Sequence, residues 1–253
     1  MTLLPWISHY GCRYVVHGDD ITSDSSGADC YRFVKAAGRF KVVKRTPGIS
    51  TTDLVGRMLL CTKEHFINSF RAVLEGREGD GSESERKARG EELRKRVRSY
   101  ATDASGWKPW VDVYDVGPDT NNQLVCTPLF NGQKPRKHQR IVYVDGGFDL
   151  FSSGHIEFLR CVYRTEEARA REQGWYKEGA RTVRLQDEGE DYDPCYIVVG
   201  IHDDAVINSI KGMNYPIMNL VERALCVLQC KVCCRHLHLS LVTETAWGTS
   251  NYH

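Results

Sequence analysis

The stretch from Ile141 to His155 most constrains the fold of this 253-residue chain. It opens with an unbroken apolar run, Ile-Val-Tyr-Val, as in a strand that is covered on both faces of a parallel sheet. Gly146 and Gly147 then allow close backbone approach, and apolar residues recur at helical spacing after Gly154. The segment predicts a strand, a glycine turn and a helix start, an arrangement that suits a nucleotide phosphate.

His155 falls in the first turn of that predicted helix, where it could donate to a phosphate oxygen. The alternative is a generic glycine turn with a histidine at the helix start. The pattern is not the G-x-G-x-x-G fingerprint, so the sequence gives no support for dinucleotide binding.

Composition narrows the class of protein. Lys and Arg number 34 against 33 Asp and Glu, so the net charge of +1 gives no global attraction to nucleic acid or to an anionic membrane. No apolar run approaches the ~20 residues of a membrane helix, and the first residues lack the pattern of a signal peptide. Ten cysteines in mostly apolar surroundings predict reduced, buried thiols in a cytoplasmic protein.

Strand-like and helix-like segments alternate over residues 1–75 and again over residues 140–232, which predicts two α/β units with parallel strands. Between them, residues 76–98 consist almost entirely of Gly, Ser, Glu, Lys and Arg. Such a run cannot bury enough apolar surface to offset its ordering entropy. We therefore predict a charged, partly disordered linker over residues 76–139.

Two segments do not fit the alternating pattern: a highly charged insertion at residues 164–193 and a tail at residues 233–253. Near the tail, six thiol and imidazole side chains gather: Cys226, Cys230, Cys233, Cys234, His236 and His238. One Cys-x-x-Cys pair has the spacing of zinc ligands. Because no second well-spaced pair follows, we expect core thiols and no metal site, with a zinc-binding module as the alternative.

Two further motifs suit a phosphate ligand. Ser50 and Asp53 have capping-box spacing, so a helix should begin there, and Arg45 just before it can add a bidentate contact. The other motif follows a predicted strand, where ligands of open α/β sheets collect: His17, Gly18 and Asp19. The alternatives are an ordinary capped helix with an exposed arginine and a polar turn.

Together these segments resemble the ethanolamine-phosphate cytidylyltransferases of phosphatidylethanolamine synthesis, a family with two tandem cytidylyltransferase domains. Residues 45–60 look like the CTP signature that closes the first domain, and residues 144–155 look like the start of the second. The matching segments, in chain order, are residues 16–21, 45–60, 144–155 and 210–223. The resemblance implies a Rossmann-like nucleotidyltransferase fold with a parallel sheet, present as two partial tandem units.

The chain also departs from the family pattern. Residues 1–75 resemble only the C-terminal half of a first domain, and residues 140–232 only the N-terminal part of a second. Ser152 stands where the His-x-Gly-His motif of the family has its first histidine. The chain is therefore expected to be an incomplete form of the enzyme.

The resemblance implies a reaction in which a phosphoethanolamine oxygen attacks the α-phosphorus of CTP and pyrophosphate leaves. It implies Mg²⁺ accompanying CTP and no tightly bound cofactor. His155 and Lys211 are expected to be catalytic, although a lysine in a loop after a helix can be merely solvated. The expected nucleotide-binding residues are His17, Gly18, Asp19, Arg45, Thr46, Gly48, Ile49, Ser50, Gly147, Phe148 and Ser152.

Two functional alternatives follow from these departures. The chain is either a cytidylyltransferase or a catalytically weak or inactive CTP-binding scaffold remnant of one. Open sheet edges of partial domains also predict association into a homo-oligomer. By resemblance we expect a cytoplasmic protein, peripheral to the endoplasmic reticulum, with no nucleic-acid partner.

Overall fold

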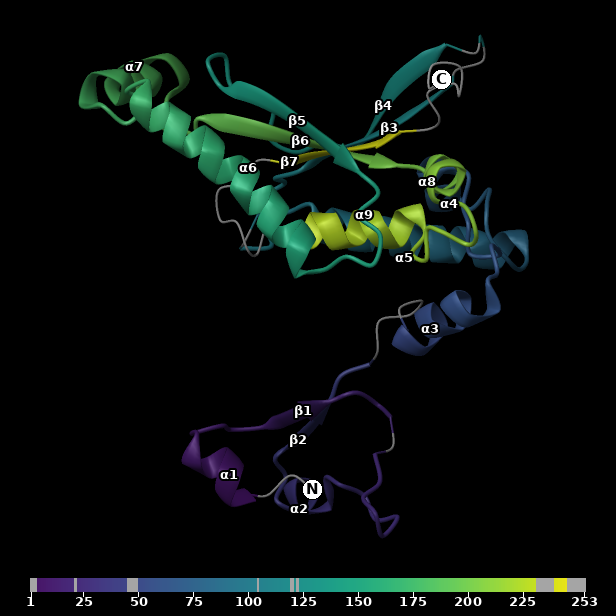
Figure 1. Cartoon of the computed structure of the whole chain (residues 1–253). Helices are drawn as coiled ribbons and strands as arrows, with labels where there is room; N and C mark the ends of the chain where they lie inside the picture. Colours follow the sequence, from purple (N-terminus) through teal and green to yellow (C-terminus); the bar gives the residue numbers. More distant parts are fainter. Residues whose placement is uncertain are drawn as a thin grey trace. The chain divides into compact units, whose positions relative to one another are not determined.

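The chain divides into two compact units, Met1–Ser50 (unit 1) and Thr51–His253 (unit 2) (Figure 1). The computed structural model describes residues 4–20, 22–44, 50–103, 105–118, 121 and 123–230, and the backbone of residues 239–244. Among the described helices, none combines the length and the apolar character needed to span a membrane.

Unit 1 contains a small parallel sheet of β1 (Val15–His17) and β2 (Phe40–Val42). Helix α2 (Arg32–Ala36) connects the two strands, and α1 (Leu4–His9) precedes them. Val34 of α2 is fully buried. The strand–helix–strand order predicted for this region is confirmed.

Unit 2 is built on a five-stranded sheet with the order β4-β3-β7-β6-β5, in which only β3 and β4 are antiparallel. Its elements are α3 (Thr51–Leu60), α4 (Phe70–Leu74), α5 (Glu83–Tyr100), β3 (Asp112–Pro118), β4 (Leu124–Phe130), β5 (Arg140–Gly146), α6 (Ser153–Glu172), α7 (Glu178–Glu188), β6 (Cys195–His202), α8 (Asp204–Lys211), α9 (Leu220–Gln229) and β7 (Leu239–Glu244). The predicted α/β class with a mainly parallel sheet is therefore confirmed.

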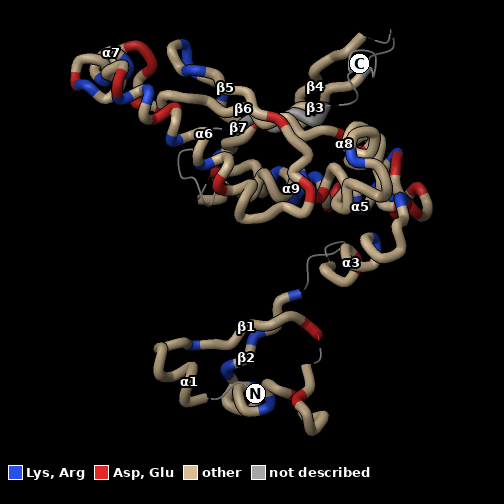
Figure 2. The backbone as a smooth tube through the Cα atoms, viewed as in Figure 1, with Lys and Arg blue, Asp and Glu red and all other residues tan. Residues whose placement is uncertain are grey.

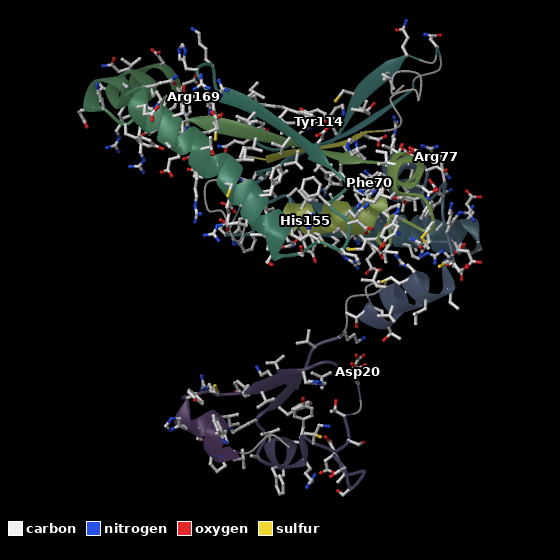
Figure 3. The ribbon with its side chains drawn as sticks, in the orientation of Figure 1. Asp20, Phe70, Arg77, Tyr114, His155 and Arg169 are labelled. Atoms are coloured by element: carbon white, nitrogen blue, oxygen red, sulfur yellow. The ribbon has the colours of Figure 1, made fainter. Side chains whose placement is uncertain are left out.

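The core of unit 2 lies between the sheet and helices α4, α5, α6 and α9 (Figure 1). Phe70 of α4 lies in this layer (Figure 3). The apolar run of β6 is largely buried. Ile197, Val199 and Ile201 on one face of the strand are at 1% exposure or less, and Tyr196 on the other face is at 2%. Residues 141–144, in β5, were predicted to form a strand that is covered on both faces. This prediction is wrong, because β5 is an edge strand whose Ile141 and Tyr143 are 59% and 49% exposed.

The partly disordered linker predicted over residues 76–139 is not what the structure contains. Ser82 and Glu85 form a capping box that starts α5, and pairs of Glu and Arg or Lys four residues apart support the helix. Val97 of α5 is fully buried, and β3 and β4 complete the sheet. The prediction of disorder from the polar composition failed because helix caps, ion pairs and a narrow apolar stripe are enough to stabilise a packed helix.

Residues 239–244 of the predicted tail have a place in the fold that the sequence did not predict. Its segment β7 lies in the sheet between β3 and β6 and is parallel to both. Because a strand at this position depends on pairing with residues more than 30 positions away, no local pattern pointed to it. The proposed division into family half-domains stays a prediction.

The eight described cysteines are all free thiols, as expected for reduced cysteines. Cys195 and Cys230 are buried, whereas four others are exposed, so the prediction of mostly buried thiols is wrong: Cys12, Cys61, Cys126 and Cys161. Four of the candidate zinc ligands lie outside the described residues: Cys233, Cys234, His236 and His238.

At Gly90, helix α5 lies close to the backbone of α4. A Cβ at this position would lie 2.6 Å from the backbone oxygen of Leu74, which cannot move without shifting α4. Gly90→Ala should therefore destabilise unit 2 by about 1–3 kcal/mol, although alanine favours helix. Gly56→Ala in α3, where nothing lies within 4 Å, should instead stabilise by about 0.5–1 kcal/mol. Urea unfolding of both variants tests this, and equal effects would contradict the close packing of α4 and α5.

Candidate functional site

The turn between β5 and α6 has an unusual backbone. Phe148 and Leu150 have positive φ angles of 52° and 46°, a region that residues with side chains rarely adopt. Phe148 is nevertheless buried, with 4% of its surface exposed, and its ring packs close to Gly146. Such conformations persist where the surroundings fix them, and they cluster at ligand sites.

His155 is held in a defined orientation at the first turn of α6 (Figure 3). The Ser152 backbone N–H donates to His155 Nδ1 at 3.1 Å, and Ser152 Oγ lies 3.3 Å from the same nitrogen. The imidazole stacks on Phe151, with ring centroids 5.2 Å apart, and contacts Phe148. Because Nδ1 accepts a hydrogen bond, the proton of the neutral ring is on Nε2, which can donate to a ligand.

Arg223 of α9 is a buried connector beneath this turn. Its side chain is fully buried and donates to the backbone oxygens of Gly147 (2.6 Å), His202 (2.8 Å) and Met218 (3.0 Å). It also forms a 2.7 Å ion pair with Asp204. One side chain therefore ties the turn after β5 to the end of β6 and to the start of α8.

Burial away from solvent is the main cause of the pKa shifts of Asp204 and Arg223. Burial raises the pKa of the Asp204 carboxyl and lowers the pKa of the Arg223 guanidinium, because desolvation disfavours both charges. Their mutual attraction opposes both shifts. Asp204 also accepts from the Ile67 backbone N–H at 2.9 Å, so both of its oxygens have donors.

Further contacts fix the loop before α9 to the site. Asp149 accepts from the backbone N–H groups of Ile217 and Met218, both at 2.8 Å. Arg57 of α3 makes a two-point contact with Glu222 of α9 at 2.8 and 3.0 Å. The second half of the segment that resembles the CTP signature thus packs against the start of α9, within unit 2.

The structure brings together four of the predicted site residues, Gly147, Phe148, Ser152 and His155, in one turn. Lys211 does not contact them in any described interaction. It is exposed at the end of α8, with its Nζ 5.7 Å from the centre of the Tyr215 ring.

In unit 1, His17 ends β1 and is partly buried, with its ring 4.7 Å from that of Tyr31. Gly18 follows it, and Asp19 is exposed. Ser50 directly precedes α3, so the predicted helix start is confirmed. Four of the predicted nucleotide-binding residues lie outside the described residues: Arg45, Thr46, Gly48 and Ile49.

Sequence reasoning missed the side chains that hold the turn and the loop before α9 in place: Arg57, Asp149, Asp204 and Arg223. A signal existed for one of them, since Arg223 interrupts an otherwise apolar helix face. Within the described part of the chain, no group of three or more His, Cys, Asp or Glu residues could hold a metal ion.

A mainly parallel sheet with a glycine turn and a capped helix at the carboxyl end of a strand is the architecture of a Rossmann-like nucleotidyltransferase. No protein-family model matches the chain. It is 36% identical to the ethanolamine-phosphate cytidylyltransferase of Mus musculus over 91% of this chain and 50% of the mouse protein.

Two other proteins give the same result. The Dictyostelium discoideum ethanolamine-phosphate cytidylyltransferase is 36% identical over 89% of this chain and 49% of its own length. The probable ethanolamine-phosphate cytidylyltransferase of Schizosaccharomyces pombe is 32% identical over 90% and 49%. The chain spans about half the length of these curated relatives. It is a half-length relative of the ethanolamine-phosphate cytidylyltransferases, which confirms the resemblance found in its motifs.

Proposed function

We propose that the chain binds CTP at the turn between β5 and α6 and transfers its cytidylyl group to phosphoethanolamine, giving CDP-ethanolamine and pyrophosphate. The observation that carries this proposal is the fixed orientation of His155, which leaves Nε2–H as a donor beside the N-terminus of α6. The names of the relatives, matched over about nine tenths of this chain, support the choice of substrates.

In the proposed reaction, a phosphate oxygen of phosphoethanolamine forms a bond to the α-phosphorus of CTP. The bond from that phosphorus to the bridging oxygen of the β-phosphate breaks, and pyrophosphate carries away the electron pair. The chain would stabilise the developing charge through the N–H groups at the start of α6 and through His155. The Mg²⁺ that accompanies CTP would neutralise part of the phosphate charge.

Ser152 favours the second candidate, a CTP-binding scaffold remnant with weak or no activity. Its hydroxyl lies beside His155 but cannot carry the positive charge of an imidazolium. One missing donor to a developing charge typically costs ~10²–10³ in rate. A cytoplasmic location at the endoplasmic reticulum and assembly into a homo-oligomer remain predictions under either candidate.

The two candidates are separated by assaying the purified chain with Mg²⁺, CTP and phosphoethanolamine. Formation of CDP-ethanolamine, absent when phosphoethanolamine is omitted, supports the enzyme. Saturable CTP binding by calorimetry without product supports the remnant. If CTP neither binds nor reacts, both are wrong.

A further inference from the structure

Strand β5 leaves one edge of the unit 2 sheet open. Among the described strands it pairs only with β6, over all seven of its residues. The backbone N–H and C=O groups on the other side of an edge strand can pair with another chain, so exposed edges are sites of association. The residues between Arg140 and Asp145 carry no charge that would oppose such pairing (Figure 2).

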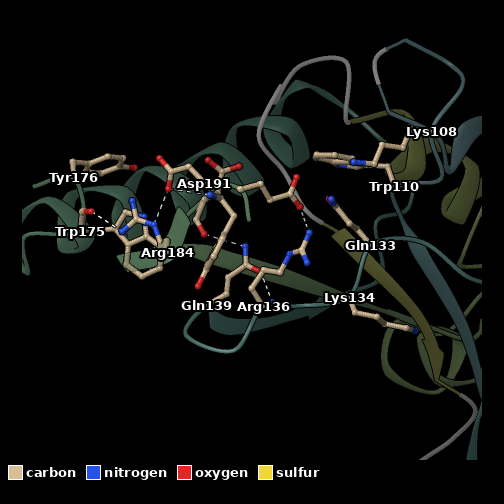
Figure 4. Close-up of a pocket in the computed structure, with 13 residues that line it drawn as sticks. Lys108, Trp110, Gln133, Lys134, Arg136, Gln139, Trp175, Tyr176, Arg184 and Asp191 are labelled. Carbon is tan, nitrogen blue, oxygen red and sulfur yellow. Dashed lines mark hydrogen bonds and ion pairs between the residues drawn. The ribbon is translucent and has the colours of Figure 1, made fainter. Parts of the chain in front are cut away.

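This edge is held in a fixed conformation at both ends. Gln139, which directly precedes β5 and lines the pocket in Figure 4, donates to the backbone oxygens of Asp193 (3.0 Å) and Cys195 (3.2 Å). Arg223 donates to the backbone oxygen of Gly147, just after the strand. The strand is therefore ordered before a partner binds, which lowers the entropy cost of association.

The other edge of the sheet is protected. Strand β4 contains Pro128, which has no backbone N–H, and its pairing with β3 shifts between Val113 and Tyr114. Proline and irregularities of this kind keep edge strands from pairing with other chains. In unit 1, β1 and β2 have only three residues each. Among the described strands, β5 is thus the one that combines length with an unprotected edge.

The side chains of β5 add an apolar surface to this edge. Ile141 and Tyr143 lie on the face of the strand that points away from the core, where they are 59% and 49% exposed. Val142 and Val144, on the other face, pack against the core. Exposed apolar side chains beside an open strand edge favour burial against a partner.

The sequence of β5 is complementary to itself when two copies run antiparallel. If Val142 of one copy lies opposite Val142 of the other, Ile141 lies opposite Tyr143 twice, and pairs of an aromatic and a β-branched residue stabilise sheets. A shift by one residue would put the exposed face of one strand beside the core face of the other. A shift by two would place Ile141 opposite the carboxylate of Asp145. The register centred on Val142 is therefore favoured.

We propose that two copies of the chain associate through their β5 strands, paired antiparallel, so that the two five-stranded sheets become one continuous sheet. A two-fold axis at Val142 relates the copies and uses the open edge of each, so the assembly closes as a dimer. This names the surface through which the homo-oligomer expected from the sequence forms. The inference does not depend on the proposed transfer of the cytidylyl group.

The test is sedimentation velocity of the full chain over a range of concentrations, with a dimer as the expected species. Ile141→Lys places a charge opposite the Tyr143 ring of the second copy, twice in each dimer, and should weaken association about a hundredfold. The matched control is Leu124→Lys on β4, because Leu124 is 52% exposed but lies on the protected edge. This control should leave the dimer unchanged.

Mixing two variants tests the register. Tyr143→Glu should also be monomeric alone, but an equal mixture with Ile141→Lys should form a dimer. In that dimer the introduced lysine lies opposite the introduced glutamate, and the remaining Tyr143 lies opposite the remaining Ile141. Circular dichroism shows whether each variant is folded. If Tyr143→Glu is not, the comparison of Ile141→Lys with Leu124→Lys decides alone.

Three outcomes would overturn the proposal. One is a chain that stays monomeric at every concentration. Another is a dimer that Ile141→Lys leaves unchanged, or that Leu124→Lys weakens equally, since a different surface would then hold it. The third is a mixture of folded Ile141→Lys and Tyr143→Glu chains that stays monomeric, which would exclude the register centred on Val142. A lack of CDP-ethanolamine formation would leave this inference intact.

Discussion

Arg223→Leu is expected to destabilise unit 2 by about 3–5 kcal/mol, because it leaves the carboxylate of a buried ion pair without its counter-charge. The guanidinium has no solvent exposure, and Asp204 has none either. Three backbone oxygens, from Gly147, Met218 and His202, lose their donor at the same time. Urea unfolding followed by circular dichroism measures the loss.

The control is Arg164→Leu, which removes an arginine from α6 whose side chain is 58% exposed and pairs with Glu157. An exposed ion pair contributes about 0–1 kcal/mol, so this variant should unfold close to the parent chain. Adding Asp204→Asn to Arg223→Leu removes the stranded charge and should recover part of the loss. If the two arginine variants were equally stable, Arg223 would not be the connector that its contacts indicate.

Which parts of the candidate site could be predicted from the sequence depends on how far apart the interacting residues lie along the chain. The strand, the turn and the helix from Ile141 to His155 were predictable because their signals are local: an apolar run, two glycines and helical spacing. Arg223, in contrast, contacts Gly147 across 76 positions and His202 across 21. No periodicity in a single sequence reports such pairs, so the turn could be predicted but not the groups that hold it.

The fold shows the same limit in its sheet. The apolar runs of β5 and β6 identified these strands, but not which of the two lies at an edge. That depends on β7, which occupies the place beside β6 and comes from a tail with no recognised pattern. The Ser82–Glu85 capping box shows that a local signal was present even in the charged segment, where composition outweighed it.

Ser152→His is expected to raise the rate of CDP-ethanolamine formation by ~10²–10³, if the missing imidazole is what limits the proposed reaction. The substitution should be tolerated, because Ser152 is exposed and contacts Nδ1 of His155 partly through its backbone N–H, which any residue retains. Loss of the serine at the N-cap costs about 1 kcal/mol of helix stability. Initial rates at saturating CTP and phosphoethanolamine measure the gain.

Two further substitutions, His155→Gln and His138→Gln, test whether the gain comes from the paired imidazoles. His155→Gln should abolish the gain when combined with Ser152→His, since the Nε2–H donor is then lost. His138→Gln is the matched control, because His138 is exposed in the connection before β5, at the other end of that strand from the turn. A Ser152→His chain that binds CTP as the parent does, yet gains no rate, would show that a second imidazole is insufficient. The parts of the family enzymes that this half-length chain does not contain would then be required for turnover, and the scaffold remnant would be the better description.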